Sequence, residues 1–336
     1  MNRKLASILQ YVFFLGLGIF LVWWSVGQVS AEQWAEIRLS IKGARFVLLV
    51  PVVIALLIAH WSRAIRWKIL MEPMGYRPGN MNTYCAVLVG YLANLAVPRL
   101  GEVLKCTLLA RYEKIPADKL IGTIVAERAF DLICLVLVSF ITVFSQIDVI
   151  GQFVMEKFRP LVTGGSHEAD PLRLLFLLLL VVVLLALAYY FFRRFSHTVF
   201  MQKLRKVLFG IWEGLTSIRL VQQKGWFFFH TILIWFLYLA SIRLGLLALQ
   251  ETSHLGWLPS FSILTMGSLG MIVTPGGIGA YPALVQETMV LYGTGEAIGI
   301  AFGWLLWLAQ FFLVLAVGFL ALLLLPALNR QTAKTA

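Results

Sequence analysis

Long apolar runs, separated by short polar segments, dominate the pattern of this chain. Six of them are expected to form full spans, and they cover residues 8–27, 46–71, 120–144, 172–192, 226–249 and 298–325. A helix needs about 20 apolar residues to cross the hydrocarbon core of a bilayer. The pattern therefore predicts an all-α polytopic membrane protein with about six full transmembrane helices.

Two further apolar stretches, 83–114 and 258–292, are broken in the middle. The first is interrupted by the polar segment 94–105, and the second by the segment 274–282, which holds two prolines and three glycines. A bilayer tolerates broken backbone and charge only where protein or a water-filled cavity surrounds them. Paired breaks in corresponding halves of a membrane protein indicate a substrate site.

The distribution of positive charge predicts the orientation. The N-terminus, the 63–77 loop, the strongly basic 193–224 segment and the C-terminal tail are expected on the cytoplasmic side, with the other loops outside. Counting crossings then requires 83–114 to enter and leave from the cytoplasm, and 258–292 to do so from outside. Each stretch is too short and too broken for two full crossings. Each therefore fits a re-entrant helical hairpin with its polar break at the tip.

These assignments predict a single integral-membrane domain, 1–336, built on an inverted repeat. Repeat unit one covers 44–144, and inverted repeat unit two covers 225–325. Residues 1–43 form a first helix and an external loop. Residues 145–224 form an external loop, a connecting helix and a cytoplasmic amphipathic segment. A plain bundle, in which each broken stretch crosses once, is the alternative.

Composition narrows the class of function. The 336 residues are 60% hydrophobic and 13% charged, and the net charge of +12 lies beside the predicted spans, so we expect no nucleic-acid partner. Cys85, Cys106 and Cys134 lie in or near apolar segments without paired spacing, which indicates packing residues. Metal-ligand spacings, hydrolase motifs and nucleotide motifs are absent from the sequence. We expect no cofactor and no catalytic residues.

The charges of the first break suggest a site for a phosphate. Arg99 and Lys105 are suited to bind it, and Glu102 is suited to balance them or to carry a proton. The alternative is an ordinary cytoplasmic loop with surface charges. Asn94 and the apolar run before it favour a buried position, because the chain is already deep in the membrane at that point.

Three charges lie inside the 120–144 span, at Glu127, Arg128 and Asp131. They form either a neutralised cluster that fixes the hairpin against the helix or a binding or proton-relay site on a cavity. In the 46–71 span, His60, Arg63 and Trp67 share one helical face. Their position near its end predicts interfacial anchors.

The second break combines Thr274 with Gly276, Gly277 and Gly279. Such a glycine run can present backbone N–H groups to an anion at a helix N-terminus. It lacks the Lys-Ser/Thr pair of a phosphate-binding loop and follows no strand, so nucleotide binding is excluded. Glu287 further on is either a cavity acid or a surface residue.

Taken in order, these three motifs resemble the lysylphosphatidylglycerol synthase transmembrane-region family, also called the flippase-like domain family. The resemblance rests on Asn94 to Lys105, Glu127 to Asp131 and Thr274 to Gly279, and it covers nearly the whole chain. It implies a bacterial or archaeal cytoplasmic-membrane protein linked to lipid translocation. We expect a stand-alone member without the synthase domain, to which aminoacyl transfer does not carry over. Many members of the family have an acidic residue shortly after this glycine run, where this chain has Tyr281 and Pro282.

The function expected from this pattern is that of a lipid flippase-like transporter. It would move a phosphate-bearing lipid, either a phospholipid or a polyprenyl lipid, between leaflets. Two alternatives stay open: an integral-membrane enzyme acting on such a lipid, and a non-transporting scaffold of a lipid or glycan pathway. Both chain termini are expected in the cytoplasm, and a homo-oligomer is not excluded.

Overall fold

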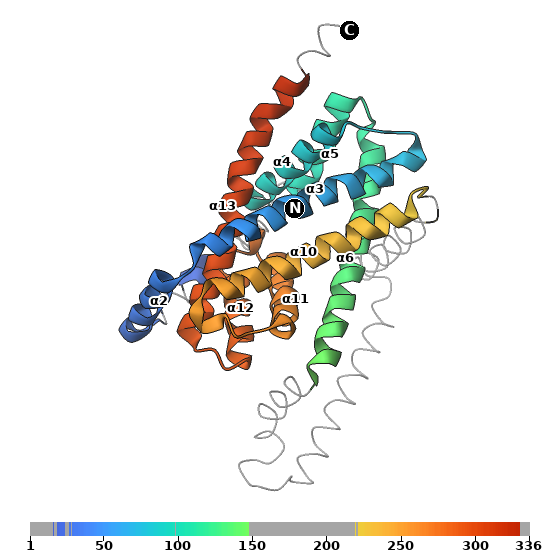
Figure 1. Ribbon diagram of the computed structural model, residues 1–336. Helices are drawn as coiled ribbons and strands as arrows, with labels where there is room; N and C mark the ends of the chain where they lie inside the picture. Colours follow the sequence, from blue (N-terminus) through green and yellow to red (C-terminus); the bar gives the residue numbers. More distant parts are fainter. Residues whose placement is uncertain are drawn as a thin grey trace, which may run out of the picture.

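The computed structural model describes residues 29–97, 99–147 and 221–329, with the single positions 16, 19–23, 27 and 219. Within this described part the regular structure is entirely helical (Figure 1). Its α-helices are α2 (Ala31–Gly43), α3 (Leu49–Met71), α4 (Asn80–Ala96), α5 (Leu100–Glu113), α6 (Ala117–Ser145), α10 (Lys224–Ala248), α11 (Trp257–Val273), α12 (Ala280–Leu291) and α13 (Glu296–Asn329). The predicted span over 172–192, the basic segment up to 218 and the C-terminal tail lie outside the described residues.

Both predicted breaks are present, and at each one the chain folds back on itself. Helix α4 ends at Ala96 and α5 begins at Leu100, and the two pack against each other. The second break runs through the short 3-10 helix η5 (Pro275–Gly277) between α11 and α12, which also pack together. Arg99 at the first turn has a φ of 66°, and Gly276 at the second has a φ of 61°. Left-handed backbone of this kind ends a helix and reverses the chain.

Helices α4 and α5 approach each other closely through two glycines. A Cβ added at Gly101 would lie 1.8 Å from the carbonyl oxygen of Gly90. Asn94 reinforces the turn, because its Oδ1 accepts a hydrogen bond of 2.8 Å from the amide of Gly101. The glycines thus provide the room, and the asparagine satisfies a backbone donor at the start of α5.

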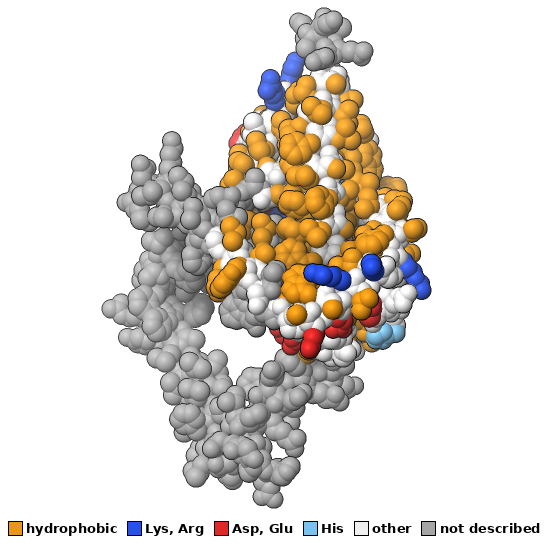
Figure 2. Space-filling model, turned by 90° about the vertical axis from the view of Figure 1, so that its left-hand side faces the viewer, with side chains coloured by type: hydrophobic (Ala, Val, Ile, Leu, Met, Phe, Trp, Pro, Cys, Tyr) orange, Lys and Arg blue, Asp and Glu red, His pale blue; other side chains and the backbone are white. Residues whose placement is uncertain are grey.

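Three of the described helical segments are long and apolar enough to cross a membrane: Phe46–Met74, α10 and α13. Among the side chains that Figure 2 colours by type, hydrophobic ones predominate, and the charged ones lie toward the upper and lower ends of the coloured part. The sequence predicts an external loop over 28–43, where the structure has α2. The capping box formed by Ser30 and Gln33 explains this helix.

The two halves of the chain pack against each other reciprocally. Helices α3 and α10 run antiparallel, since Arg45 N donates to the Ala248 carbonyl at one end and Gln223 bonds to Glu72 at the other. The α4–α5 hairpin contacts α13, and the α11–α12 hairpin contacts α6. The hairpin of each half therefore packs against the last helix of the other half.

A cluster of hydrogen-bonded polar side chains stabilises each of these reciprocal contacts. In the α13 polar cluster, Asn329 bonds to Asn82 at 2.9 and 3.0 Å, and Asn82 bonds to Glu113 at 2.6 Å. In the α6 polar cluster, Gln146 bonds to the Leu258 carbonyl at 3.0 Å and to the hydroxyls of Ser262 and Tyr292. Both clusters join the end of a long helix to the base of the opposite hairpin.

Candidate functional site

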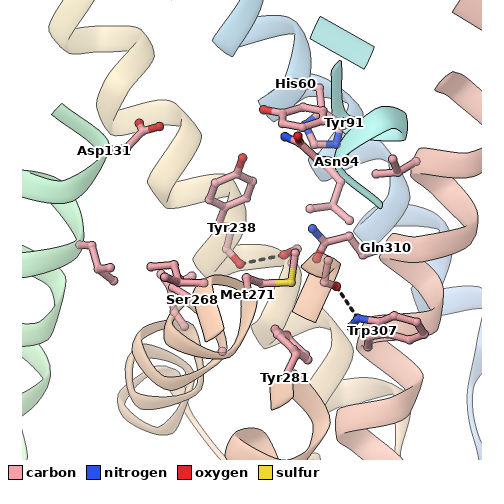
Figure 3. A pocket seen from close by; sticks show the side chains of 18 of the residues that line it. His60, Tyr91, Asn94, Asp131, Tyr238, Ser268, Met271, Tyr281, Trp307 and Gln310 are labelled. Atoms are coloured by element: carbon pink, nitrogen blue, oxygen red, sulfur yellow. Dashed lines mark hydrogen bonds between the residues drawn. The ribbon is translucent and has the colours of Figure 1, made fainter. Parts of the chain in front are cut away.

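The tips of the two hairpins meet in the interior. A Cβ added at Gly276 in η5 would lie 3.2 Å from Leu95, near the end of α4. Trp307 of α13 holds the second tip in place, because its Nε1 donates a hydrogen bond of 2.9 Å to the Gly276 carbonyl. Next to this junction is a cavity of about 480 Å³, lined by residues of α3, α4, α6 and α10 to α13 (Figure 3). Its volume is typical of a site for a small organic group.

The cavity is polar at one end and apolar at the other. In Figure 3, Asp131 lies at the upper left of the cavity and His60, Tyr91 and Asn94 at its upper right, whereas Met271, Tyr281 and Trp307 lie in the lower half. That apolar wall is formed by residues of α11, α12 and α13 that include Ile263, Leu264, Met271, Tyr281, Trp307 and Phe311. A chamber of this form suits an amphipathic ligand.

Buried ion pairs support the polar end. Glu127 of α6 has no exposed side-chain area, and its two oxygens lie 3.0 Å from Arg63 Nη1 and 2.8 Å from Lys105 Nζ. The Asp131 carboxylate lies 2.5 Å from Arg63 Nη1 and 2.6 Å from Arg66 Nη2. These contacts join α3, the α4–α5 hairpin and α6 at the cavity wall, which Arg63 and Asp131 line. We call these five residues the buried ion network.

The buried ion network is not electrically neutral. Its three cations face two carboxylates, which leaves one positive charge in a region where Arg66 and Glu127 have no exposed side-chain area. Removing one member of such a network leaves its partner unpaired, and that is far more costly than losing a surface pair. Lys105 has an additional contact, because its Nζ lies 4.5 Å from the centre of the Trp67 ring.

A second, more accessible ion pair lies beside the cavity. Arg128 Nε is 3.0 Å from Glu102 Oε1, and the two side chains are 43% and 32% exposed. Arg128 lines both the main cavity and a small niche that Glu102 and Lys105 also line. Arg128 therefore connects the hairpin to the chamber without being fully engaged by its partner.

Several polar atoms around the cavity have no hydrogen-bond partner among the described residues. They are both ring nitrogens of His60, Nε of Arg63, the hydroxyl of Tyr91 and Nε1 of Trp235. His60 is 3% exposed and packs its ring 4.8 Å from that of Tyr91. Buried polar atoms are normally satisfied, so these atoms are available to bind water or a ligand in the cavity.

The structure brings some of the predicted site residues together and separates others. Asn94, Arg128, Asp131 and Gly276 line the cavity. Glu102 and Lys105 line the adjoining niche, and Glu127 is buried behind it. Arg99 is exposed at the first tip, and Glu287 is exposed on α12. Neither is part of the cavity wall.

The glycine run at the second tip satisfies most of its own amides. The amide of Gly277 donates to the Thr274 carbonyl, that of Ile278 to Pro275, and that of Ala280 to Ile278. The Thr274 hydroxyl donates to the Ile278 carbonyl at 2.9 Å. Thr274, Gly277 and Gly279 thus build the turn, and Gly276 is the member of the run that lines the chamber.

One prediction from the sequence is wrong. His60, Arg63 and Trp67 are buried at 3%, 6% and 0% exposure, so they are not interfacial anchors. The acids Glu127 and Asp131 were the signal that cations must come from another helix, because a charge inside an apolar span requires a partner. Nothing in the sequence marks the aromatic lining residues, because aromatic residues are common throughout the spans.

Comparison with known proteins gives a family match and a partial match to one relative. Residues 8–318 match the family described as the lysylphosphatidylglycerol synthase TM region. The chain belongs to this family. It is also 31% identical over 99 residues to a UPF0104 membrane protein of Methanocaldococcus jannaschii, a match that covers 29% of this chain and 27% of that relative. No solved structure matches the chain significantly.

Membership in the lysylphosphatidylglycerol synthase transmembrane-region family confirms the resemblance on which the sequence analysis relied. Together with the apolar helices, it identifies this chain as a membrane protein. The matched region includes both hairpins and the buried ion network. The cavity is therefore part of the region that the chain shares with the family.

Proposed function

We propose that this protein moves a phosphate-bearing lipid between the two leaflets of its membrane. The observation that carries the proposal is the cavity beside the hairpin tips, which joins a charged wall to an apolar wall within a bundle that includes helices long and apolar enough to cross a membrane. A phosphate requires cationic or donor groups, whereas acyl or polyprenyl chains require an apolar surface. The chamber offers both at once.

The proposed membrane arrangement is that of two re-entrant hairpins in an inverted repeat, with units 44–144 and 225–325 and both termini in the cytoplasm. The reciprocal packing of each hairpin against the last helix of the other half supports a two-fold relation. The antiparallel pairing of α3 with α10 supports it too, because an in-plane two-fold axis reverses equivalent helices. A bacterial or archaeal cytoplasmic membrane is the proposed location.

In this proposal the first unit holds the head group. Arg128 contacts the phosphate, because its guanidinium is half-exposed beside the cavity and is well suited to bind oxyanions. Asn94 and Asp131 complete the polar wall, and Gly276 keeps the opposite tip small. Glu102, Lys105 and Glu127 hold Arg128 and the hairpin in position. Arg99, exposed at the tip, attracts anionic head groups from the membrane surface.

The reciprocal polar clusters suggest how access alternates. Rocking of one unit against the other would open one cluster while the second stays closed, so that the chamber faces one leaflet at a time. The α13 and α6 polar clusters lie at the bases of different hairpins, as such a mechanism requires. The sequence has no nucleotide motif, so we propose passive or ion-coupled movement.

A reconstitution experiment tests the function. Purified protein is incorporated into vesicles that contain a fluorescent phospholipid in both leaflets, and dithionite then bleaches the accessible outer leaflet. We expect the bleached fraction to rise from about half to nearly all when the protein is present. Mass spectrometry of the recovered lipid must find it chemically unchanged, because an enzyme acting on the lipid would alter it.

Two variants test the site. Arg128→Ala is expected to lower the rate of translocation at least tenfold, whereas Glu287→Gln, exposed and outside the cavity wall, is expected to behave as the wild type. Wild-type vesicles that bleach like protein-free vesicles would refute translocation of the lipid tested. Full activity of the Arg128 variant would refute the assigned cavity.

A further inference from the structure

We infer that the cavity selects a lipid whose head group carries a negative phosphate and no amine. This inference rests on the proposed function, and it decides between two classes of substrate that the proposal leaves open. Zwitterionic and cationic lipids carry a phosphate and an ammonium together. An anionic lipid carries the phosphate alone, either with hydroxyl groups or as a terminal phosphate.

The unpartnered groups along the cavity are mainly donors. The indole of Trp235 can only donate, and the hydroxyl of Tyr91 and one ring nitrogen of His60 can donate as well. The side-chain oxygen of Asn94 already accepts from the Gly101 amide, which leaves its NH₂ group for the cavity. A ligand that satisfies these groups must supply acceptors, as phosphate oxygens do.

The carboxylates with which an ammonium would pair are already occupied. Both oxygens of Glu127 receive ion pairs, and the side chain has no exposed area. Each oxygen of Asp131 lies 2.5 or 2.6 Å from an arginine nitrogen, and the side chain is 14% exposed. The neutral acceptors of Ser268 and Gln310 belong to other parts of the wall, away from this cluster of charges.

The net charge favours an anion as well. The buried ion network has one cation in excess, and the Arg128–Glu102 pair adds one charge of each sign. A head group with one negative charge neutralises this excess, whereas an added ammonium increases the repulsion. Because the side chains of the network are buried, both effects are larger than they would be at a surface.

The opposite wall distinguishes a lipid from a free anion. It consists largely of apolar and aromatic side chains that include Met271, Trp307 and Phe311. Inorganic phosphate would leave this wall without a contact. The methylenes of an acyl or polyprenyl chain would instead be buried against it, so the chains add affinity that phosphate alone lacks.

Equilibrium binding to the purified protein tests the selectivity. Tryptophan emission reports occupancy, because Trp235 and Trp307 both line the cavity. The probes are dihexanoyl phosphatidylglycerol, dihexanoyl phosphatidylethanolamine and inorganic phosphate. We expect the anionic lipid to bind at least about tenfold tighter than the zwitterionic one, as the loss of a hydrogen bond to a charged group predicts. Inorganic phosphate is expected to bind more weakly than either lipid.

A matched pair of tyrosine variants ties this selectivity to the cavity. Tyr91→Phe removes an unpartnered donor from the wall, and Tyr84→Phe removes a hydroxyl from the same helix outside the wall. The first is expected to weaken binding of the anionic lipid about tenfold, with a smaller effect on the zwitterionic lipid. The second is expected to leave both affinities unchanged. Equal binding of the two lipids, or an unchanged ratio in Tyr91→Phe, would overturn the inference.

The same lipids in the vesicle assay separate this inference from the proposed function. Selective binding of the anionic lipid without movement would refute transport and support the selectivity. Equal binding and equal movement of both lipids would support transport and refute the selectivity. Inorganic phosphate that binds as tightly as the anionic lipid would show a site for a free anion and refute the lipid as its ligand.

Discussion

Replacing Glu127 by glutamine removes the central anion of the buried ion network with little change in shape. Three cations, Arg63, Arg66 and Lys105, then face the single carboxylate of Asp131. Glu127 has no exposed side-chain area, so water does not replace the lost charge. Breaking a buried pair by removing one partner costs about 3–5 kcal/mol. In a large domain this corresponds to a fall of about 6–10 °C in Tm.

Substitution of Lys105, an ion-pair partner of Glu127, is expected to lower Tm by less than Glu127→Gln does. Lys105→Met leaves two cations against two carboxylates, so it loses one charge-assisted hydrogen bond, about 1.5–3 kcal/mol. The double variant Lys105→Met/Glu127→Gln restores the original excess of one cation. We therefore expect it to be more stable than Glu127→Gln alone, although it carries the additional substitution.

Thermal unfolding of the purified proteins in one detergent measures these differences, and size-exclusion chromatography confirms the folded fraction. Glu287→Gln is the control, because it makes the same chemical change on an exposed residue. The reasoning is refuted if Glu127→Gln has the same Tm as this control. It is also refuted if the double variant is destabilised by the sum of its two single effects, because a shared network requires coupling.

Three other predictions follow from single contacts. Gly101→Ala brings a methyl group against the backbone of α4 and should reduce the yield of folded protein measured by size-exclusion chromatography, whereas Gly122→Ala on an open face of α6 should raise Tm slightly. Arg99→Gly should relieve about 1 kcal/mol of left-handed backbone strain and raise Tm, whereas Arg99→Ala keeps the strain and should not raise Tm. Both variants remove the positive charge, so if that charge attracts the lipid, both should slow translocation equally. Asn329→Leu and Gln146→Leu weaken opposite polar clusters. In a background without the three native cysteines, each should expose one cysteine introduced into the cavity wall to a membrane-impermeant thiol reagent, and the two variants should do so from opposite faces. Labelling from the same face in both variants would contradict alternating access.

The helices and their breaks could be predicted from the sequence because their causes are local. Apolar runs, prolines and glycines act within a few residues, and the predicted stretch 46–71 corresponds closely to α3 at Leu49–Met71. The predicted break after Asn94 is also present, between Ala96 and Leu100. Local preference and the packed structure agree at these positions, so no knowledge of the fold was required.

The partners of the buried acids could not be predicted, because they depend on packing between distant helices. Arg63 precedes Asp131 by 68 positions, and nothing in the local pattern distinguishes an arginine that pairs inward from one that extends to the membrane surface. The nearer candidate, Arg128, lies 3.9 Å from Asp131 and forms its closer pair with Glu102. The spacing along α6 therefore indicated Arg128 as the partner of Asp131, whereas in the fold Asp131 pairs more closely with Arg63 and Arg66.

The two walls of the cavity come from different halves of the chain, and this division has a consequence for the mechanism. The charged wall belongs to α3, α4 and α6, and the apolar wall belongs mainly to α11, α12 and α13. A lipid in the chamber would be held at its head by one half and along its chains by the other. If the halves move against each other, neither carries the lipid alone. Substitutions in the charged wall should then change which lipid is bound, whereas substitutions that enlarge the apolar wall should change how fast any accepted lipid crosses.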